Sequence, residues 1–137
     1  MEKGRADLGM LPVENELSGS LPQAYELLME RDLRIRAEVI MRVQHTLMAA
    51  PGVKLADLRR VRSTPTSLIQ CEKFIKRYGL EQITASDTAG SAHDLAARPE
   101  ADLGVIASRL AAQIYKLDIL EEEIEDIDLL QESMIEV

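Results

Sequence analysis

The sequence lacks tryptophan and contains only one cysteine, one phenylalanine and three tyrosines. The lone Cys71 excludes an internal disulfide, and His45 and His93 are too isolated to suggest a metal site, so we expect no metal or cofactor. Scarce aromatic side chains argue against stacking platforms for single-stranded nucleic acid, so no nucleic-acid partner is expected.

Long apolar runs are also missing. None approaches the roughly 20 residues that a membrane span needs, and the first residues lack the apolar core of a signal peptide. We therefore expect no membrane partner and a cytoplasmic location. The 137 residues, 46% hydrophobic and 29% charged, are typical of one soluble domain with a core.

Negative charge is concentrated at the C-terminal end. From Asp118 onward the chain has nine acidic and no basic residues, although the net charge of the whole chain is only -8. The preceding 117 residues are nearly balanced, and an anionic small molecule would meet no strong opposing field there. The acidic end is interpreted as a solvated face, with a protein-interaction element as the alternative.

Hydrophobic patterning predicts alternating strands and helices. Strands are expected at residues 8–13, 33–43, 60–62, 82–85 and 103–106, and helices at about 21–28, 65–79, 88–99 and 108–115. Ser20 and Ser108 are expected to cap their helices. This order predicts an α/β fold with a largely parallel sheet. Residues 117–127 fit either a continued helix or a strand across 117–120.

The expected helix at 65–79 has an apolar face. Its inward side chains are predicted to be Leu68, Ile69, Cys71, Phe74 and Ile75. Cys71 is interpreted as a packed core residue, because the sequence shows no arrangement typical of a cysteine or serine nucleophile.

Three polar turns each follow an expected strand and open an expected helix. They are residues 14–20, 63–67 and 86–90. Ligands of open α/β sheets bind beyond the carboxyl ends of the strands, where helix N-termini offer free N–H groups to anions. Each turn alone is an ordinary helix cap, but their recurrence favours one shared site for a carboxylate-bearing ligand.

Five segments, in order, resemble motifs of the prephenate dehydratase family. They are residues 11–15 with 18–20 (LPVEN, SGS), 63–71 (STPTSLIQC), 86–89 (SDTA), 103–115 (LGVIASRLAAQIY) and 124–126 (IED). The corresponding family motifs are P-[IV]-E-N-S-x-x-G, S-H-P-Q-A-L-x-Q-C, S-x-T-A, A-A-I-A-S-x-x-A-A-x-x-Y and I-x-D. The resemblance covers nearly the whole chain.

The resemblance implies a fold, a reaction and a substrate. The fold is the type II periplasmic-binding-protein-like α/β fold, with two lobes around a cleft. Residues 1–20 and 101–137 would belong to an incomplete first lobe, and residues 21–100 to the second. The enzymes are lyases of phenylalanine biosynthesis that convert prephenate, a dicarboxylate, to phenylpyruvate with loss of water and carbon dioxide.

The resemblance also assigns site residues. Asn15, Ser63 and Gln70 would be the catalytic polar groups of the cleft. Substrate-binding positions would be Glu14, Gly19, Thr88 and Ala89. The reaction needs one positioned acid, because protonating the ring hydroxyl makes it a leaving group, together with donors for two carboxylates.

The sequence departs from the family pattern at several positions. Glu16 replaces the usual Ser after E-N, and Thr64 and Thr66 replace the His and Gln of S-H-P-Q. The T-R-F motif has no match, since Glu132, Ser133 and Met134 stand at or near its place. The resemblance further implies a catalytic domain truncated at both ends and no ACT domain.

Two functional hypotheses follow from the resemblance, beside the interaction element that the acidic end alone would suggest. The first is a prephenate dehydratase; the second is a non-catalytic derivative that binds a carboxylate ligand or acts as an interaction module. A homodimer is expected in either case, because family members generally self-associate and an incomplete first lobe leaves an edge to cover.

Overall fold

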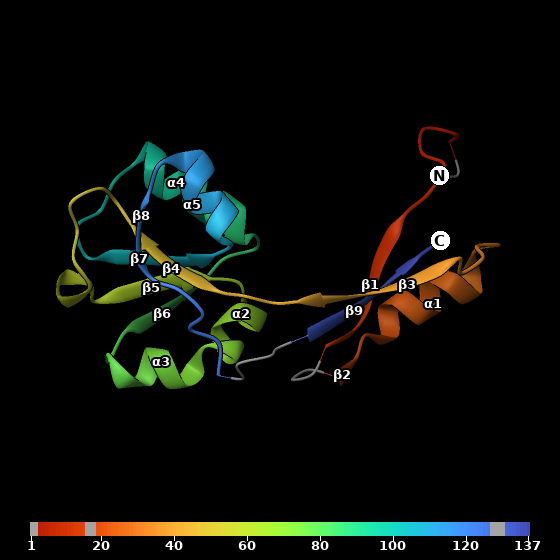
Figure 1. The fold of residues 1–137 in the computed structure, drawn as a ribbon, viewed down its shortest axis with the longest axis horizontal. Coiled ribbons are helices and arrows are strands. Elements are labelled where there is room, and N and C mark those ends of the chain that lie inside the picture. Colours follow the sequence, from red (N-terminus) through yellow and green to blue (C-terminus); the bar gives the residue numbers. More distant parts are fainter. Residues whose placement is uncertain (1–2, 16–18, 127–130) are drawn as a thin grey trace. The chain divides into compact units, whose positions relative to one another are not determined.

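A computed structural model describes residues 3–15, 19–126 and 131–137. The chain forms two compact units (Figure 1): unit 1 comprises Met1–Val43 with Leu129–Val137, and unit 2 comprises Gln44–Asp128. These boundaries differ from the lobe boundaries expected at 20/21 and 100/101. Strand pairing explains the difference, because residues 37–42 pair with the C-terminal strand and residues 103–107 pair with residues 46–49. The assignment of lobes within the family stays a prediction.

Unit 1 is an antiparallel sheet with one helix. Its strands are β1 (Met10–Asn15), β2 (Gly19–Ser20), β3 (Ala37–Arg42) and β9 (Gln131–Glu136), in the order β2-β1-β9-β3. The helix α1 (Pro22–Glu30) lies against this sheet in Figure 1. Val13, Ala24, Ile135 and Val137 form the buried core between them. β9 lies between β1 and β3 and therefore joins them into one sheet.

Unit 2 contains a mixed five-stranded sheet. Its strands are β4 (Thr46–Ala49), β5 (Arg60–Ser63), β6 (Glu81–Thr84), β7 (Leu103–Ala107) and β8 (Asp118–Glu121), in the order β6-β5-β7-β4-β8. β5 pairs in parallel with β6 and β7, whereas β4 runs antiparallel to β7 and β8. The prediction of a largely parallel sheet is therefore wrong. The alternation of strands and helices correctly indicated β5, β6 and β7, but it missed β4.

Two hydrophobic layers pack on opposite faces of the unit 2 sheet. Neighbouring residues of a strand point to opposite faces, so Leu47 and Ile106 enter one layer while Met48 and Val105 enter the other. The first layer includes the helices α2 (Pro65–Gln70) and α3 (Glu72–Arg77), and the second includes α4 (Thr88–Ala97) and α5 (Arg109–Tyr115). Figure 1 shows the two pairs of helices on opposite sides of the sheet. A short 3₁₀ helix, η1 (Leu55–Asp57), precedes β5.

The expected helix at 65–79 is divided at Cys71. That residue has φ −114° and ψ 19°, and it ends α2 and begins α3. Cys71 is fully buried, as predicted, but Ile69 is 65% exposed, so its assignment to the inward face is wrong. Leu68 and Ile69 lie about 100° apart around a helix, and Leu68 takes the position facing the sheet.

The ambiguous segment after α5 forms a strand. α5 ends at Tyr115, the following Lys116 has the left-handed φ of 56°, and β8 begins two residues later at Asp118. The helical spacing did not mark a buried face, because Leu110 and Ile114 are 62% and 61% exposed. Ile127, the last residue of the ambiguous segment, lies outside the described residues.

The predicted caps agree with the structure at one of two helices. The Ser108 side chain accepts a hydrogen bond from Ala111 N and begins α5 as predicted. Ser20 does not cap α1, because it is part of β2 and pairs with Glu14. Leu21 occupies the N-cap position of α1, and no side chain caps this helix. None of the helices in the described segments combines the length and apolar character of a membrane crossing.

Candidate active site

Three parallel strands of unit 2 end at the same edge of the sheet. β5 lies between β6 and β7, and their last residues are Ser63, Thr84 and Ala107. Ser63 is directly paired with Thr84, and its neighbour Arg62 with Val105. The turns expected at residues 63–67 and 86–90 therefore leave this edge together, and each opens a helix.

Ser63 is a fully buried hydroxyl at this edge. Its Oγ donates a hydrogen bond of 2.7 Å to the carbonyl oxygen of Ile106 in β7. The side chain thus continues the pairing of β5 with β7 by one position beyond the backbone ladder. Because its proton is used in this bond, Ser63 has only its lone pairs to offer to another group.

The two turns are capped as helix starts. Thr64 Oγ1 accepts from Ser67 N at 3.3 Å, and Asp87 Oδ2 accepts from Gly90 N at 2.8 Å. Thr88 and Ala89 are the first two residues of α4, with Thr88 partly buried and Ala89 exposed. A cavity of about 780 Å³ lies beside this turn; Ser86, Asp87 and Gly90 line it together with residues of α4 and β5.

Gln70 is buried at the end of α2 and contacts His45. Its Oε1 lies 2.6 Å from His45 Nε2. A single short segment holds both backbones: Ile124 N donates to His45 O, and Asp126 N donates to Gln70 O. The sequence gives no signal for this contact, because no local pattern links residues that are 25 positions apart.

The thiol of Cys71, next to Gln70, is not suited to act as a nucleophile. Burial raises the pKa of its thiol far above the ordinary value, and the carboxylates of Glu125 and Asp126 raise that pKa further. The thiol therefore stays protonated at neutral pH, and it lacks the thiolate character of a nucleophile.

The predicted site residues of unit 1 share a second cavity. Glu14, Asn15 and Gly19 line a space of about 320 Å³. Ser20, Glu38, Ile40 and Ser133 complete the lining. Asn15 is buried, and Ser133 Oγ donates to Glu38 Oε1 at 2.6 Å. Glu16 and Ser18, which belong to the same predicted turn, lie outside the described residues.

The structure thus brings some predicted site residues together within each unit. In unit 1, three of them line one cavity. In unit 2, Ser63 ends β5, the start of α4 follows the neighbouring strand β6, and Gln70 lies at the C-terminal end of α2 beside His45. The first polar turn differs from the other two, because it leaves an antiparallel sheet and opens α1 without a side-chain cap.

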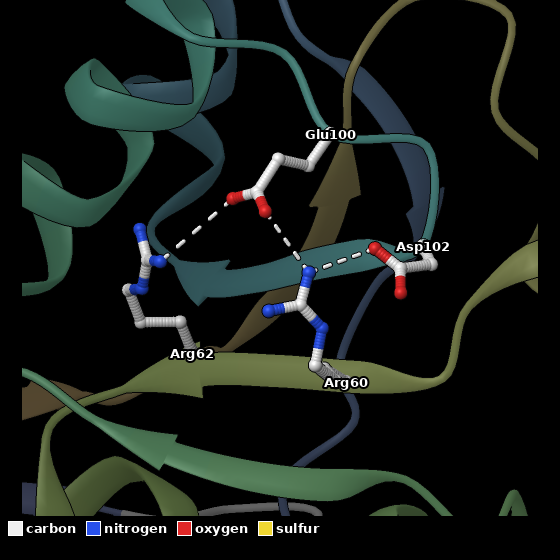
Figure 2. Close-up of polar contacts among 4 residues, drawn as sticks. All are labelled: Arg60, Arg62, Glu100 and Asp102. Carbon is white, nitrogen blue, oxygen red and sulfur yellow. Dashed lines mark hydrogen bonds and ion pairs between the residues drawn. The ribbon is translucent and has the colours of Figure 1, made fainter.

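The basic residues of β5 are engaged with carboxylates. Figure 2 shows Arg60 between Glu100 and Asp102, with Nη2 at 3.0 Å and 2.8 Å from their oxygens; Arg62 is 3.9 Å from Glu100. Arg60 begins β5, at the end opposite Ser63. Its hydrogen bond and charge lower the pKa of Asp102, and the two carboxylates raise the pKa of Arg60. Arg60 therefore fastens the amino end of β5 to the loop before β7.

Among the described residues, no group of three or more His, Cys, Asp or Glu side chains is arranged to hold a metal ion.

The family model for prephenate dehydratase matches residues 1–129, which is most of the chain and includes all of unit 2 and the N-terminal segment of unit 1. The chain belongs to the prephenate dehydratase family. The resemblance of the ordered motifs is thereby confirmed.

Sequence relatives come from plants and bacteria. The chain is 41% identical over 126 residues to arogenate dehydratase 2 of Petunia hybrida, covering 92% of this chain and 32% of that protein. It is 39% identical over 123 residues to a bifunctional N-acyl-homoserine lactone acylase/prephenate dehydratase of Komagataeibacter europaeus, covering 90% of this chain and 44% of that protein. The chain therefore spans less than half the length of these curated relatives.

Solved structures, among them a prephenate dehydratase, share the fold. The enzyme of Arthrobacter aurescens in complex with L-Phe matches with a TM-score of 0.87 and 27% identity, over 98% of this chain and 46% of that one. GqqA, described as a novel type of quorum-quenching acylase, matches with a TM-score of 0.83 and 36% identity, over 98% of this chain and 48% of that one. The α/β class of the prediction is confirmed, with two sheets, one mixed and one antiparallel.

Proposed function

We propose that the chain carries the decarboxylating dehydration of its family, in which prephenate loses water and carbon dioxide to give phenylpyruvate on the way to phenylalanine. The observation that carries this proposal is the family match over residues 1–129. The non-catalytic alternative has no specific observation in its favour. The type II periplasmic-binding-protein-like fold, with two lobes around a cleft, is part of the same proposal.

The proposed site residues come from both units. Asn15 would act from the unit 1 cavity, where Glu14 and Gly19 also line the wall. Ser63 and Gln70 would act from unit 2, with Thr88 and Ala89 at the start of α4. Amide N–H groups suit the carboxylates of the substrate, because donors to an anion form strong, charge-assisted hydrogen bonds.

The substrate is proposed as prephenate or its amino analogue arogenate. Relatives of the chain are named for either compound, and some are named for both. Both carry carboxylates, so donors of the kind offered by Asn15 and Gln70 suit either one. A side-by-side comparison of kcat/KM on the two substrates decides the preference.

A homodimer and a cytoplasmic location are further proposals. β3 is an edge strand whose residues are all exposed, and Val39, Ile40 and Met41 place apolar side chains there. Such an edge favours self-association. Sedimentation equilibrium of the wild type and Ile40→Lys tests the dimer: the variant should be monomeric. Cell fractionation tests the location.

The test of the activity is turnover by the purified 137-residue chain. Prephenate and arogenate are supplied separately at neutral pH, and product formation is compared with a no-enzyme control. Asn15→Ala should abolish turnover. Gln113→Ala is the matched control, because it removes an exposed amide from α5 and should leave the rate unchanged. A folded chain that converts neither substrate contradicts the proposal; calorimetric binding without turnover would then support the non-catalytic alternative.

A further inference from the structure

We propose that His45 is a positioning residue that fixes which end of the Gln70 amide faces the ligand. This inference rests on the proposed function, in which Gln70 binds a carboxylate-bearing substrate. It assigns a role to a residue that none of the predicted site motifs contains.

The contact between the two side chains is short and buried. His45 Nε2 and Gln70 Oε1 are 2.6 Å apart, and the two residues are 7% and 3% exposed. An amide oxygen only accepts hydrogen bonds, so the imidazole must donate through Nε2–H. The structure therefore assigns His45 the tautomer protonated at Nε2, and a fully protonated imidazole would keep the same donor.

The backbones of His45 and Gln70 are held by hydrogen bonds that do not involve the His45 and Gln70 side chains. The segment 124–126 bonds to both partners: Ile124 N to His45 O at 3.2 Å, and Asp126 N to Gln70 O at 2.8 Å. His45 N also donates to Glu125 Oε2 at 3.4 Å. These bonds fix the two backbones relative to each other, so the side-chain contact is preorganised.

The consequence concerns the amide nitrogen of Gln70. It has no hydrogen-bond partner among the described residues. With its oxygen held by His45, Gln70 offers two N–H donors. The opposite tautomer would turn the amide around and offer an oxygen, which repels a carboxylate.

The first test reads the tautomer directly. Long-range ¹H–¹⁵N spectra at about pH 8, above the ordinary titration range of histidine, should show His45 protonated at Nε2. His45→Leu should shift and broaden the Gln70 side-chain NH₂ signals, whereas Gln44→Leu should not. Gln44 is the adjacent residue, and its amide bonds to Glu123 on the exposed side. Protonation at Nδ1, or unchanged NH₂ signals in His45→Leu, would overturn the inference.

The second test is a double-mutant cycle on turnover. His45→Leu should lower kcat/KM roughly 10- to 100-fold, as misplaced site groups do. His45→Gln, which retains a donor near the Nε2 position, should restore much of that loss. In a Gln70→Ala background, His45→Leu should cost little more, because its effect passes through Gln70. Additive losses would overturn the positioning role and indicate a general loss of folding.

The two tests separate this inference from the proposed function. If the wild-type chain neither binds nor converts prephenate and arogenate, the proposed function fails, and with it the statement about the ligand. The nuclear magnetic resonance data then still decide whether His45 holds the amide in the stated orientation.

Discussion

Ser63 shows how one buried hydroxyl can support the sheet at the place where a site is expected. Its bond to Ile106 O joins β5 to β7 at the last position of the strand. The same hydroxyl was predicted to be catalytic, and its bond restricts it to accepting from a ligand. At the scale of single residues, the structural bond of this hydroxyl therefore limits the catalytic role predicted for it.

The bond of Ser63 predicts a loss of stability on its removal. Ser63→Ala leaves the buried carbonyl of Ile106 without its partner, so the free energy of unfolding should fall by about 1 to 3 kcal/mol. Urea denaturation followed by circular dichroism measures it. Ser86→Ala, on an exposed serine at the same edge, is the control and should change stability by less than about 0.5 kcal/mol. Equal effects of the two variants would contradict the account.

The ion pair of Asp102 predicts a pH dependence. Arg60 lowers the pKa of Asp102 in the folded chain, so the carboxylate contributes stability above its unfolded pKa and loses that contribution as pH falls through the folded pKa. The wild type should therefore be more stable than Asp102→Asn at neutral pH, and the difference should shrink below about pH 4. Urea midpoints at both pH values measure this. Asp94→Asn, on an exposed side chain, should show no comparable difference, and a gap that widens in acid would contradict the assignment.

At the scale of elements, the capped helix α4 can be tested through its first turn. Asp87 Oδ2 accepts from Gly90 N at 2.8 Å, so Asp87→Ala should lower the free energy of unfolding by about 1 kcal/mol. Asp94→Ala removes an acidic side chain from the exposed surface of the same helix and serves as the control. Thermal unfolding compares the two variants. A loss as large in Asp94→Ala would show that charge, and not the cap, is responsible.

Local sequence signals predicted the elements whose ends are marked by capping residues or proline. β5, β6 and their following helices were found because Thr64-Pro65 and Asp87 mark the helix starts. β4 was missed because its four residues are buried on both faces, so they show no alternation. β9 was missed because Gln131, Glu132 and Ser133 give little strand signal, and pairing with β1 and β3 on both sides compensates.

The candidate site was predicted as a set of residues but not as an arrangement. Gln70 and Ser63 were singled out from motifs, and both are buried beside polar partners. Their partners, His45 and Ile106, are distant in sequence and carry no local signal. Only the pairing of strands and the segment 124–126 brings such residues together, and these are tertiary contacts.

At the scale of the whole molecule, the two units differ in chain continuity. Unit 2 is one continuous segment, whereas the sheet of unit 1 needs β9 from the C-terminal end between β1 and β3. Deleting residues 131–137 should therefore abolish amide protection in β1 and β3 and leave that of β5 and β7 intact. Hydrogen exchange measured residue by residue tests this. Retained protection in β3, or a loss spread over both units, would contradict the division.

A point variant provides a milder version of the same test. Ile135 is buried in the unit 1 core, so Ile135→Ala should reduce amide protection in unit 1 by an amount equivalent to about 2 to 4 kcal/mol. Protection in unit 2 should be unchanged, because the described core clusters of that unit contain no residue of β9.

Turnover by the purified wild-type chain is the decisive measurement for the proposed dehydratase activity. Prephenate and arogenate are each incubated with the protein at neutral pH beside a no-enzyme control and beside Asn15→Ala, with folding of both samples verified by circular dichroism. We expect product formation by the wild type on at least one substrate and its loss in Asn15→Ala. A folded wild type with a rate equal to that of the no-enzyme control on both substrates would contradict the proposed activity.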